Sequence, residues 1–281
     1  MSRILVTGAA GQVGRALLAA AGPARDVTGF TSAQWDITDP GAASGRLRDG
    51  DVLVNCAAYT NVDAAETDPD TAFAVNAAGP GHLAGACALA GARLIHISTD
   101  YVFGGGPRPP APYEPTDATA PMQVYGAGKL AGETAVQAAL PTVTVVRTAW
   151  VYTGHRGGTD FVSVMRARAE AGAKVQVVDD QIGSPTYVAD LVDALLHIVD
   201  AGVSAPIVHA ANAGAVSRWE QARAVYTACG ADPDLVEPVP GADYRRPAPR
   251  PSYSALGARE STAAGLPPLR DWRAGLAAAL R

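Results

Sequence analysis

Short apolar runs alternate with longer Ala- and Leu-rich segments along the first half of the chain. Strands are predicted at 3–7, 26–31, 51–58 and 92–103 (the last including its exit), and helices at 15–21, 71–90 and 125–139. The run at 51–58 is apolar and continuous, which is typical of a strand buried on both faces of a parallel sheet. Strands that alternate with helices predict an α/β fold built on a doubly wound parallel Rossmann sheet.

The pattern is looser in the second half of the chain. Helices are predicted at 161–171, 187–199 and 216–229, and strands at 174–178 and 206–211. We therefore expect a first domain over residues 1–150 and a smaller, mixed α/β C-terminal domain over most of 151–281. Leu191, Leu195 and Ile198 share one side of the helix near 187–200, so this helix is expected to pack back on the first domain.

Three evenly spaced glycines follow the first strand. They form a Gly-x-x-Gly-x-x-Gly turn that leads into a helix. Such glycines permit a tight turn, close approach of the backbone to a pyrophosphate, and close packing of the helix on the strand. The helix N-terminus then offers unpaired N–H groups to the phosphates, so this turn is predicted to bind a dinucleotide through Gly8, Gly11, Gln12, Val13 and Gly14. The alternative is an ordinary turn between strand and helix, for which one glycine would usually suffice.

The end of the second strand bears on which dinucleotide is bound. An acid there would bind the ribose of NAD, but the run 26–31 ends without one, and Arg25 precedes it. The missing acid favours NADPH, and NADH stays an alternative. Asp36 and Ile37 lie where a third strand would end, where they could border the adenine. For Asp36 the alternative is a turn or cap residue.

Polar side chains follow the strand at 92–103. Thr99, Asp100 and Tyr101 are expected at the carboxyl edge of the sheet, where ligands bind in open α/β folds. A hydroxyl there can donate a hydrogen bond to a substrate carbonyl, although Thr99 could equally cap a turn. Asn76, a polar residue within the helix 71–90, is expected to be solvated, and the alternative is a buried orienting residue.

Tyr125 and Lys129 are the strongest candidates for chemistry. In a helix, residues four apart share a face, and an ammonium beside a phenol lowers the pKa of the phenol. A tyrosine prepared in this way can pass a proton to a carbonyl oxygen near neutral pH. The pair alone is weak evidence, because Tyr-x-x-x-Lys occurs by chance in many helices.

Composition excludes several classes of function. Hydrophobic residues make up 48% and charged residues 17% of the 281 residues, as in a globular protein. The net charge of −5 gives no electrostatic reason to expect nucleic acid or a membrane surface as partner. No apolar run is long enough to span a bilayer and no leader peptide is recognised, so a cytoplasmic protein is expected. Cys56, Cys87 and Cys229 lack metal-ligand spacing; we expect reduced, mostly buried thiols and no metal site.

Several stretches together resemble a known family. The glycine turn, Thr99 and the Tyr125/Lys129 pair look like an extended short-chain dehydrogenase/reductase. Longer stretches are more similar to dTDP-4-dehydrorhamnose reductases, and they span nearly the whole chain in order: 55–63, 98–103, 147–152, 178–186 and 250–256. The resemblance implies a nicotinamide cofactor and a dTDP-sugar substrate, bound by the first and second domains respectively, in a monomer or homodimer.

The resemblance also implies roles for the matching residues. Hydride would pass from NADPH or NADH to C4 of a dTDP-4-keto-6-deoxy-L-sugar, and Tyr125 would protonate the new alkoxide. Lys129 would lower the pKa of Tyr125 and hold the nicotinamide ribose, while Thr99 would bind the carbonyl. Asp100, Tyr101 and Trp150 would hold the sugar, and the stretch along the cofactor would be Ala58, Tyr59 and Thr60.

A basic, Pro-rich segment follows at 245–251. Its Arg250 falls in a family-like stretch, and its guanidinium could bind the nucleotide diphosphate, although a solvated loop is an equal alternative. Gly104, Gly128 and Asp160 depart from the family pattern, which often has an acid, a Ser or Thr, and an Asn at these positions. Asp160 places a carboxylate near the expected substrate domain and leaves that contact open.

Two other functions compete with the reductase. The first is another nucleotide-sugar enzyme of the superfamily, either an epimerase or a dehydratase. A dehydratase would carry Asp-Glu after the threonine, whereas Tyr101 follows Asp100 here. The second is a non-catalytic, NADP-binding regulatory subunit, the role that a relative of this family serves for a methionine adenosyltransferase. A regulatory chain has no need of Tyr125, Lys129 and Thr99 together.

Overall fold

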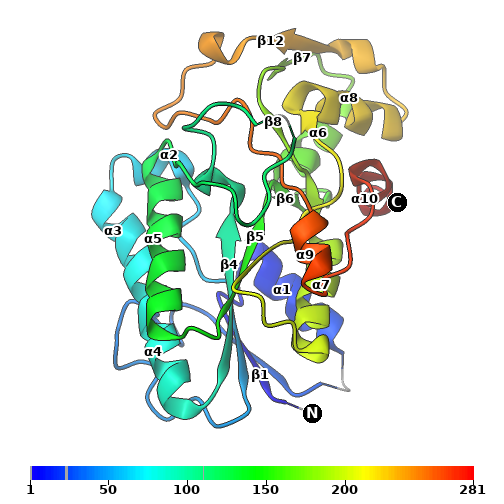
Figure 1. Ribbon diagram of the computed structural model, residues 1–281. Coiled ribbons are helices and arrows are strands. Elements are labelled where there is room, and N and C mark those ends of the chain that lie inside the picture. Colours follow the sequence, from blue (N-terminus) through cyan, green and yellow to red (C-terminus); the bar gives the residue numbers. More distant parts are fainter. Residues whose placement is uncertain (1, 23–24, 110) are drawn as a thin grey trace.

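The computed structural model describes residues 2–22, 25–109 and 111–281 and contains a six-stranded parallel sheet (Figure 1). The strand order is β10-β5-β4-β3-β1-β2, and every neighbouring pair is parallel. The strands are β1 (Ile4–Thr7), β2 (Val27–Phe30), β3 (Val52–Asn55), β4 (Arg93–Thr99), β5 (Thr144–Thr148) and β10 (Ile207–His209). The predicted α/β fold with a parallel Rossmann sheet is confirmed.

Helices cover both faces of this sheet. Figure 1 shows α3, α4 and α5 on one side and α1 and α7 on the other. The first group comprises α2 (Val62–Ala65), α3 (Pro69–Phe73), the π-helical turn η1 (Ala74–Ala78), α4 (Gly79–Ala90) and α5 (Val124–Ala139). The second comprises α1 (Gln12–Ala21) and α7 (Val188–Ala201), which pack against each other.

The side chains of each strand alternate between two apolar cores. Ile4 and Val6 of β1 pack with Leu17 of α1 and Leu195 of α7, whereas Leu5 packs in the core beneath α4 and α5. This alternation follows from the period of two along a strand. The sheet is therefore buried on both faces, which explains why its strands are apolar and continuous in the sequence.

Most of the remaining elements lie beyond the carboxyl ends of the strands, and many of them are at the top of Figure 1. Three two-stranded pairings hold it: β7 with β12, β8 with β11, and β6 with β9. Their bounds are β6 (Val151–Tyr152), β7 (Val175–Val178), β8 (Ile182–Gly183), β9 (Thr186–Tyr187), β11 (Val216–Ser217) and β12 (Val236–Val239). The helices of this part are α6 (Phe161–Glu170), α8 (Arg218–Ala228) and α10 (Trp272–Ala279), with 3-10 turns η3 (Pro233–Leu235) and η4 (Gly241–Asp243), whereas α9 (Arg259–Ala263) contacts β10 of the main sheet. Their shared core includes Tyr152, Tyr226 and Trp272.

The structure corrects one predicted element and refines two others. No strand ends at Asp36; its carboxylate instead accepts hydrogen bonds from Thr38 N (2.9 Å) and Oγ1 (2.8 Å), as expected for a turn residue. Within the stretch 92–103, predicted as a strand and its exit, the strand β4 ends at Thr99 and the exit forms the 3-10 turn η2 (Asp100–Val102). The predicted helix 71–90 passes through the π-helical turn η1, and its second segment, α4, begins at Gly79 with Pro80 in the first turn. Among the described residues, no helix is long and apolar enough to cross a membrane.

Candidate active site

A cavity of about 550 Å³ lies at the carboxyl ends of β1, β3, β4 and β5. Thirteen of the residues predicted to bind cofactor or substrate line it: Gly8, Gly11, Gln12, Val13, Asp36, Ile37, Ala58, Thr60, Thr99, Asp100, Tyr125, Lys129 and Trp150. Four others, Gly14, Tyr59, Tyr101 and Arg250, are not among its lining residues. The topology thus brings into one cavity residues that are far apart in the sequence.

The glycine turn forms one wall of this cavity. Gly8 has a φ of +70°, and a Cβ there would lie 2.5 Å from Ala57 N. A Cβ at Gly14 would collide with the Gly8 carbonyl, so this glycine serves the packing of α1 on the turn. Gly11 is the N-cap of α1 and makes no side-chain cap, which leaves the N–H groups of the first turn open to the cavity. In the orientation that satisfies its amide, Gln12 accepts from Thr153 N at 3.1 Å and links the turn to β6.

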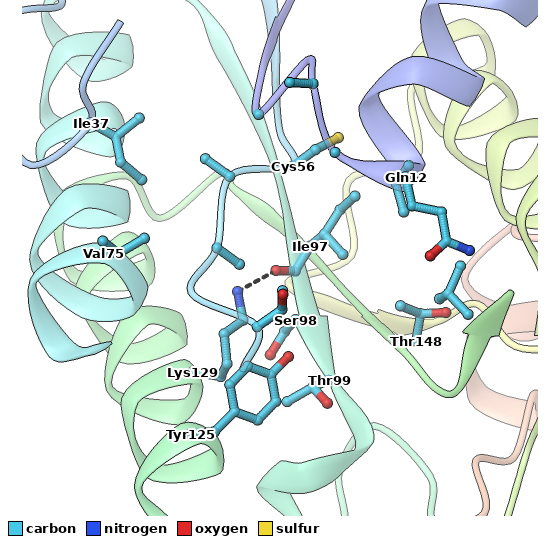
Figure 2. Close-up of a pocket in the computed structure, with 18 of the residues that line it drawn as sticks. Gln12, Ile37, Cys56, Val75, Ile97, Ser98, Thr99, Tyr125, Lys129 and Thr148 are labelled. Atoms are coloured by element: carbon cyan, nitrogen blue, oxygen red, sulfur yellow. Dashed lines mark hydrogen bonds between the residues drawn. The ribbon is translucent and has the colours of Figure 1, made fainter. Parts of the chain in front are cut away.

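Tyr125 and Lys129 project from the first turns of α5 into the same cavity (Figure 2). Lys129 Nζ donates to the Ile97 carbonyl at 2.7 Å, and burial lowers the pKa of Lys129 to about 8. Burial raises the pKa of Tyr125, and the neighbouring Thr99 hydroxyl lowers it only in part. The net change in the pKa of Tyr125 is thus opposite to the expected fall, because desolvation is the largest effect on this phenol.

Thr99 takes the cap role that was one of its two alternatives, and it also contacts Asp100. Its Oγ1 accepts from Tyr101 N at 3.2 Å, which caps η2, and donates to Asp100 Oδ1 at 3.1 Å. Asp100 is 2% exposed, and its other oxygen accepts from Ser254 Oγ at 2.6 Å. Burial raises the pKa of Asp100 to about 6, although these two hydroxyls and the charge of Arg218 lower it. A carboxyl that titrates near pH 6 thus lies beside the proton-donor candidate.

Asp100→Asn is expected to stabilise the protein at neutral pH. Because the pKa of Asp100 is raised in the folded state, its ionisation destabilises the fold as pH rises from about 4 to 6. A shift of about two units corresponds to about 3 kcal/mol, an upper bound for the gain. Urea unfolding of both proteins between pH 4 and 7 should show the variant's advantage growing with pH and absent at pH 4. If the free energies of unfolding of the two proteins changed with pH in parallel, the raised pKa of Asp100 would be contradicted.

Asn76 corrects a prediction. Its side chain is completely buried, not solvated; its oxygen accepts from Tyr59 N (2.9 Å) and its nitrogen donates to Tyr59 O (3.0 Å). The amide therefore holds the stretch that follows β3 along the cavity. Gly126 and Gly132 of α5 serve a related purpose, since Cβ atoms there would collide with the carbonyls of Tyr101 and Asn76. These glycines allow α5 to approach neighbouring backbone.

Arg218 is a candidate that sequence reasoning missed. Its guanidinium carbon lies 3.5 Å from the ring centroid of Trp150 and 4.9 Å from that of Phe161. Burial lowers the pKa of Arg218 to about 10, while the charges of Tyr101 and Asp100 raise it. The sequence around it, Val-Ser-Arg-Trp, carries no motif; only the pairing of β11 with β8 brings it to Trp150.

The basic segment at 245–251 is anchored to the first half of the chain. Asp63 of α2 pairs with Arg250 (3.0 Å) and Arg246 (3.3 Å) and accepts from Ala248 N (3.3 Å). The side chain of Arg250 is 11% exposed, which excludes the solvated-loop alternative for this residue. Arg250 lines a second cavity of about 300 Å³ instead of the main one, together with Gln181 and Tyr244.

Other expected residues have structural explanations. The Asp160 carboxylate caps α6 at Ser163 N and accepts from Thr153, so its contacts lie within the chain. The three cysteines are unpaired, but only Cys87 is buried, and Cys56 lines the main cavity, which the prediction of mostly buried thiols did not foresee. Within the described ranges, no cluster of His, Cys, Asp and Glu could hold a metal ion. Tyr101 packs edge-on against Tyr125, with ring centroids 6.0 Å apart.

Comparison with known proteins gives consistent matches over the full chain. The family described as "RmlD substrate binding domain" matches residues 1–281. The dTDP-4-dehydrorhamnose reductase of Mycobacterium tuberculosis (strain H37Rv) is 61% identical, over 99% of this chain and 92% of that protein. A probable dTDP-4,6-dihydroxy-2-methyloxan-3-one 4-ketoreductase of Streptomyces antibioticus is 45% identical, over 98% and 93%. The crystal structure of dTDP-4-dehydrorhamnose reductase from Bacillus anthracis in complex with NADP superposes with a TM-score of 0.91 at 34% identity, covering 98% of both chains.

Proposed function

The chain belongs to the dTDP-4-dehydrorhamnose reductase family, and we propose that it reduces the C4 ketone of dTDP-4-dehydro-6-deoxy-L-mannose to dTDP-L-rhamnose, with NADPH or NADH as reductant. This is the last step of dTDP-rhamnose biosynthesis. The observation that carries the proposal is that Tyr125, Lys129 and Thr99 line the same cavity as the glycine turn.

The glycine-turn side of the cavity fits a nicotinamide dinucleotide. Gly8 allows the turn to pack against the backbone of Ala57, Gly11 presents no side chain to the cavity, and the uncapped N-terminus of α1 supplies N–H donors for a pyrophosphate. Ala58, Tyr59 and Thr60 would follow the cofactor, and Asp36 and Ile37 would border its adenosine. When bound, the reduced nicotinamide supplies the hydride. β2 ends without an acid, and Ser32 lines the cavity next to it, which favours NADPH over NADH.

Tyr125 would donate the proton to the carbonyl oxygen as it becomes an alkoxide. The raised pKa of Tyr125 keeps the phenol protonated near neutral pH, which is the form that a donor needs. Thr99 would hold the carbonyl oxygen by a hydrogen bond. Lys129, oriented by the Ile97 carbonyl, would place an ammonium near the phenol and bind the nicotinamide ribose.

The sugar nucleotide would extend from this point towards the second cavity. Asp100, Tyr101 and Trp150 would contact the sugar. Arg218 lies against Trp150, and Arg250 is held by Asp63, so both guanidinium groups are placed to bind a diphosphate. The bidentate fork of arginine suits phosphate oxygens better than a lysine would.

We also propose a division of the chain near residue 150, with α7 and β10 belonging to the first domain. β10 completes the six-stranded sheet, and α7 packs on α1. We expect a cytoplasmic protein that is a monomer or a homodimer. The molecular mass from light scattering would decide between monomer and homodimer.

Two alternatives are weaker. A different dTDP-4-keto sugar is favoured by the similarity to the Streptomyces antibioticus 4-ketoreductase, whose name differs in the sugar. A regulatory subunit has less support, because Tyr125, Lys129 and Thr99 converge on one cavity. A dehydratase has less support because Tyr101, which packs on Tyr125, stands where a dehydratase would carry an acid, and an epimerase would show no net oxidation of the cofactor.

The deciding experiment follows the reduced-nicotinamide absorbance with the purified protein. The dTDP-4-keto-6-deoxy-L-sugar is added in parallel to NADPH and NADH, and we expect loss of absorbance that requires the sugar and is faster with NADPH. The 4-keto D-sugar serves as the comparison substrate. Cofactor binding without turnover of either sugar would refute the reductase and support the regulatory alternative.

A further inference from the structure

A buried polar cluster lies directly behind the candidate catalytic pair. Glu133 and Arg147 form a two-pronged ion pair, with Nε–Oε1 2.9 Å and Nη2–Oε2 2.7 Å. Ser98 Oγ donates to the same Oε1 at 2.5 Å. All three side chains are at most 3% exposed, and Lys129, one helical turn before Glu133, is 2% exposed.

The strand register and the helix spacing bring these groups together. Ser98 of β4 lies opposite Arg147 of β5 in the parallel pairing, so both side chains point to the face covered by α5. Glu133 follows Lys129 by four positions, and so lies on the same side of α5. The cluster therefore joins β4, β5 and α5 at the level of the active site.

Stability alone is a weak reason for such a cluster. The desolvation of a buried ion pair often exceeds its Coulombic gain, and apolar residues of similar volume would commonly be as stable. The position of Ser98 suggests another reason. It stands between Ile97, whose carbonyl accepts from Lys129, and Thr99, which faces the cavity. Fixing the Ser98 side chain fixes the backbone on either side of it.

The charge of Glu133 also acts on Lys129. The titratable groups that face Lys129 are Cys56 after β3, His96 on β4, and Tyr125 and Glu133 on α5, with Arg147 of β5 bonded to Glu133. Burial lowers the pKa of His96 and raises that of Cys56 to about 12, so both are neutral near pH 7. The Glu133 carboxylate is then the charge that opposes the effect of burial on the pKa of Lys129.

We propose that Glu133 is a positioning residue for the reaction. Held by Arg147, its carboxylate anchors Ser98 and thereby the strand end that orients Lys129 and the neighbouring threonine. The same carboxylate keeps an opposite charge beside the lysine. The proposal rests on the function proposed above, in which Lys129 contacts the cofactor and the phenol.

A titration of the free protein tests the electrostatic part. The chain has two lysines, Lys129 and Lys174, so carbon-13 labelling of lysine Cε gives one signal for each. Lys174, 63% exposed and paired with Glu237, is the internal reference. In Glu133→Gln the midpoint of the Lys129 signal should fall by about one pH unit, with Lys174 unchanged. An unchanged Lys129 midpoint would overturn the proposal.

Kinetics test the positioning part. Activity requires charged Lys129, so it is high below the pKa of this lysine and is lost as pH rises through it. The basic limb of kcat/KM should therefore move to lower pH in Glu133→Gln. Ser98→Ala keeps the ion pair between Glu133 and Arg147. In this variant we expect kcat to be about tenfold lower, while the basic limb of kcat/KM and the KM for NADPH stay nearly unchanged. The control is Asp51→Asn, which removes a buried carboxylate that binds Arg3 at the amino edge of the sheet. It should change neither the kcat nor the basic limb of kcat/KM.

One further variant guards against a folding failure. Glu133→Gln leaves Arg147 without its carboxylate, so Glu133→Gln/Arg147→Met removes both charges together. The Lys129 midpoint should still fall, but by less than in Glu133→Gln, because the lost guanidinium charge had itself disfavoured the ammonium. The titration does not depend on turnover. A parent protein that fails to consume NADPH with the keto sugar would thus refute the proposed function, while the titration still decides whether Glu133 acts on Lys129. An active parent, combined with unaltered kcat in Ser98→Ala, would overturn the anchoring role of Glu133.

Discussion

Tyr125→Phe should lower kcat at least a hundredfold, because the variant keeps the ring but has no proton to donate to the alkoxide. General acid catalysis by a positioned side chain is worth about 10²–10⁴ in rate. The ring of Tyr125 packs edge-on against Tyr101, and phenylalanine can keep that contact. Cofactor affinity should therefore change little. The measurements are kcat from reduced-nicotinamide absorbance and the NADPH dissociation constant from a fluorescence titration.

A matched variant separates the loss of the proton donor from the loss of a buried tyrosine hydroxyl elsewhere in the chain. Tyr152 is 1% exposed, and its hydroxyl has no hydrogen-bond partner among the described residues. Tyr152→Phe should leave kcat within about twofold of the parent, since isosteric changes of this kind are usually tolerated. If Tyr125→Phe also turned over at nearly the parent rate, Tyr125 would not be the proton donor.

Gly11→Leu should weaken NADPH binding by at least about tenfold, or about 1.4 kcal/mol, and leave the sugar nucleotide nearly unaffected. Gly11 lines the cavity with a φ of −74°, a backbone conformation that leucine adopts without strain. Its Cβ would meet only the Gly8 carbonyl, at 3.2 Å, so the fold should tolerate the change. The added side chain would occupy the space where a pyrophosphate approaches the turn. Gly8 would give a less clear result, because its φ of +70° would strain any side chain.

The control for this substitution is Gly85→Leu on α4. A Cβ there meets nothing within 4 Å, so cofactor binding should stay at the parent level. Two calorimetric titrations of each variant, one with NADPH and one with dTDP, give the comparison. Equal losses for both ligands in Gly11→Leu would place Gly11 somewhere other than the pyrophosphate site.

Much of the cavity could be predicted because its signals are local. The glycine turn depends on residues within one strand–helix connection, and the spacing of Tyr125 and Lys129 depends on one helical turn. The strand ends that carry Thr99 and Asp100 follow from the apolar pattern of a parallel sheet, whose carboxyl ends meet at one edge. Even the missing acid after β2 can be read without coordinates.

The errors arose where burial decides the outcome. Asn76 was expected in solvent because polar residues usually are, yet it is buried against the backbone of Tyr59. The pKa of Tyr125 was expected to fall beside a cation, and desolvation raises it instead. Neither result can be read from residue spacing, because burial is a property of everything packed around a group.

The sequence by itself determined the fold class, the dinucleotide turn and the residues proposed to donate the proton and orient its donor, since each depends on a periodicity or a short motif. Only the tertiary structure decided that Arg218 lies on Trp150, that Asp63 holds Arg250, and that Ser98, Glu133 and Arg147 meet. These contacts join segments up to 187 positions apart (Asp63 to Arg250), through pairings that no local pattern encodes. Charged and polar side chains of this kind acquire their partners, and hence their pKa values, only when packing has removed them from water.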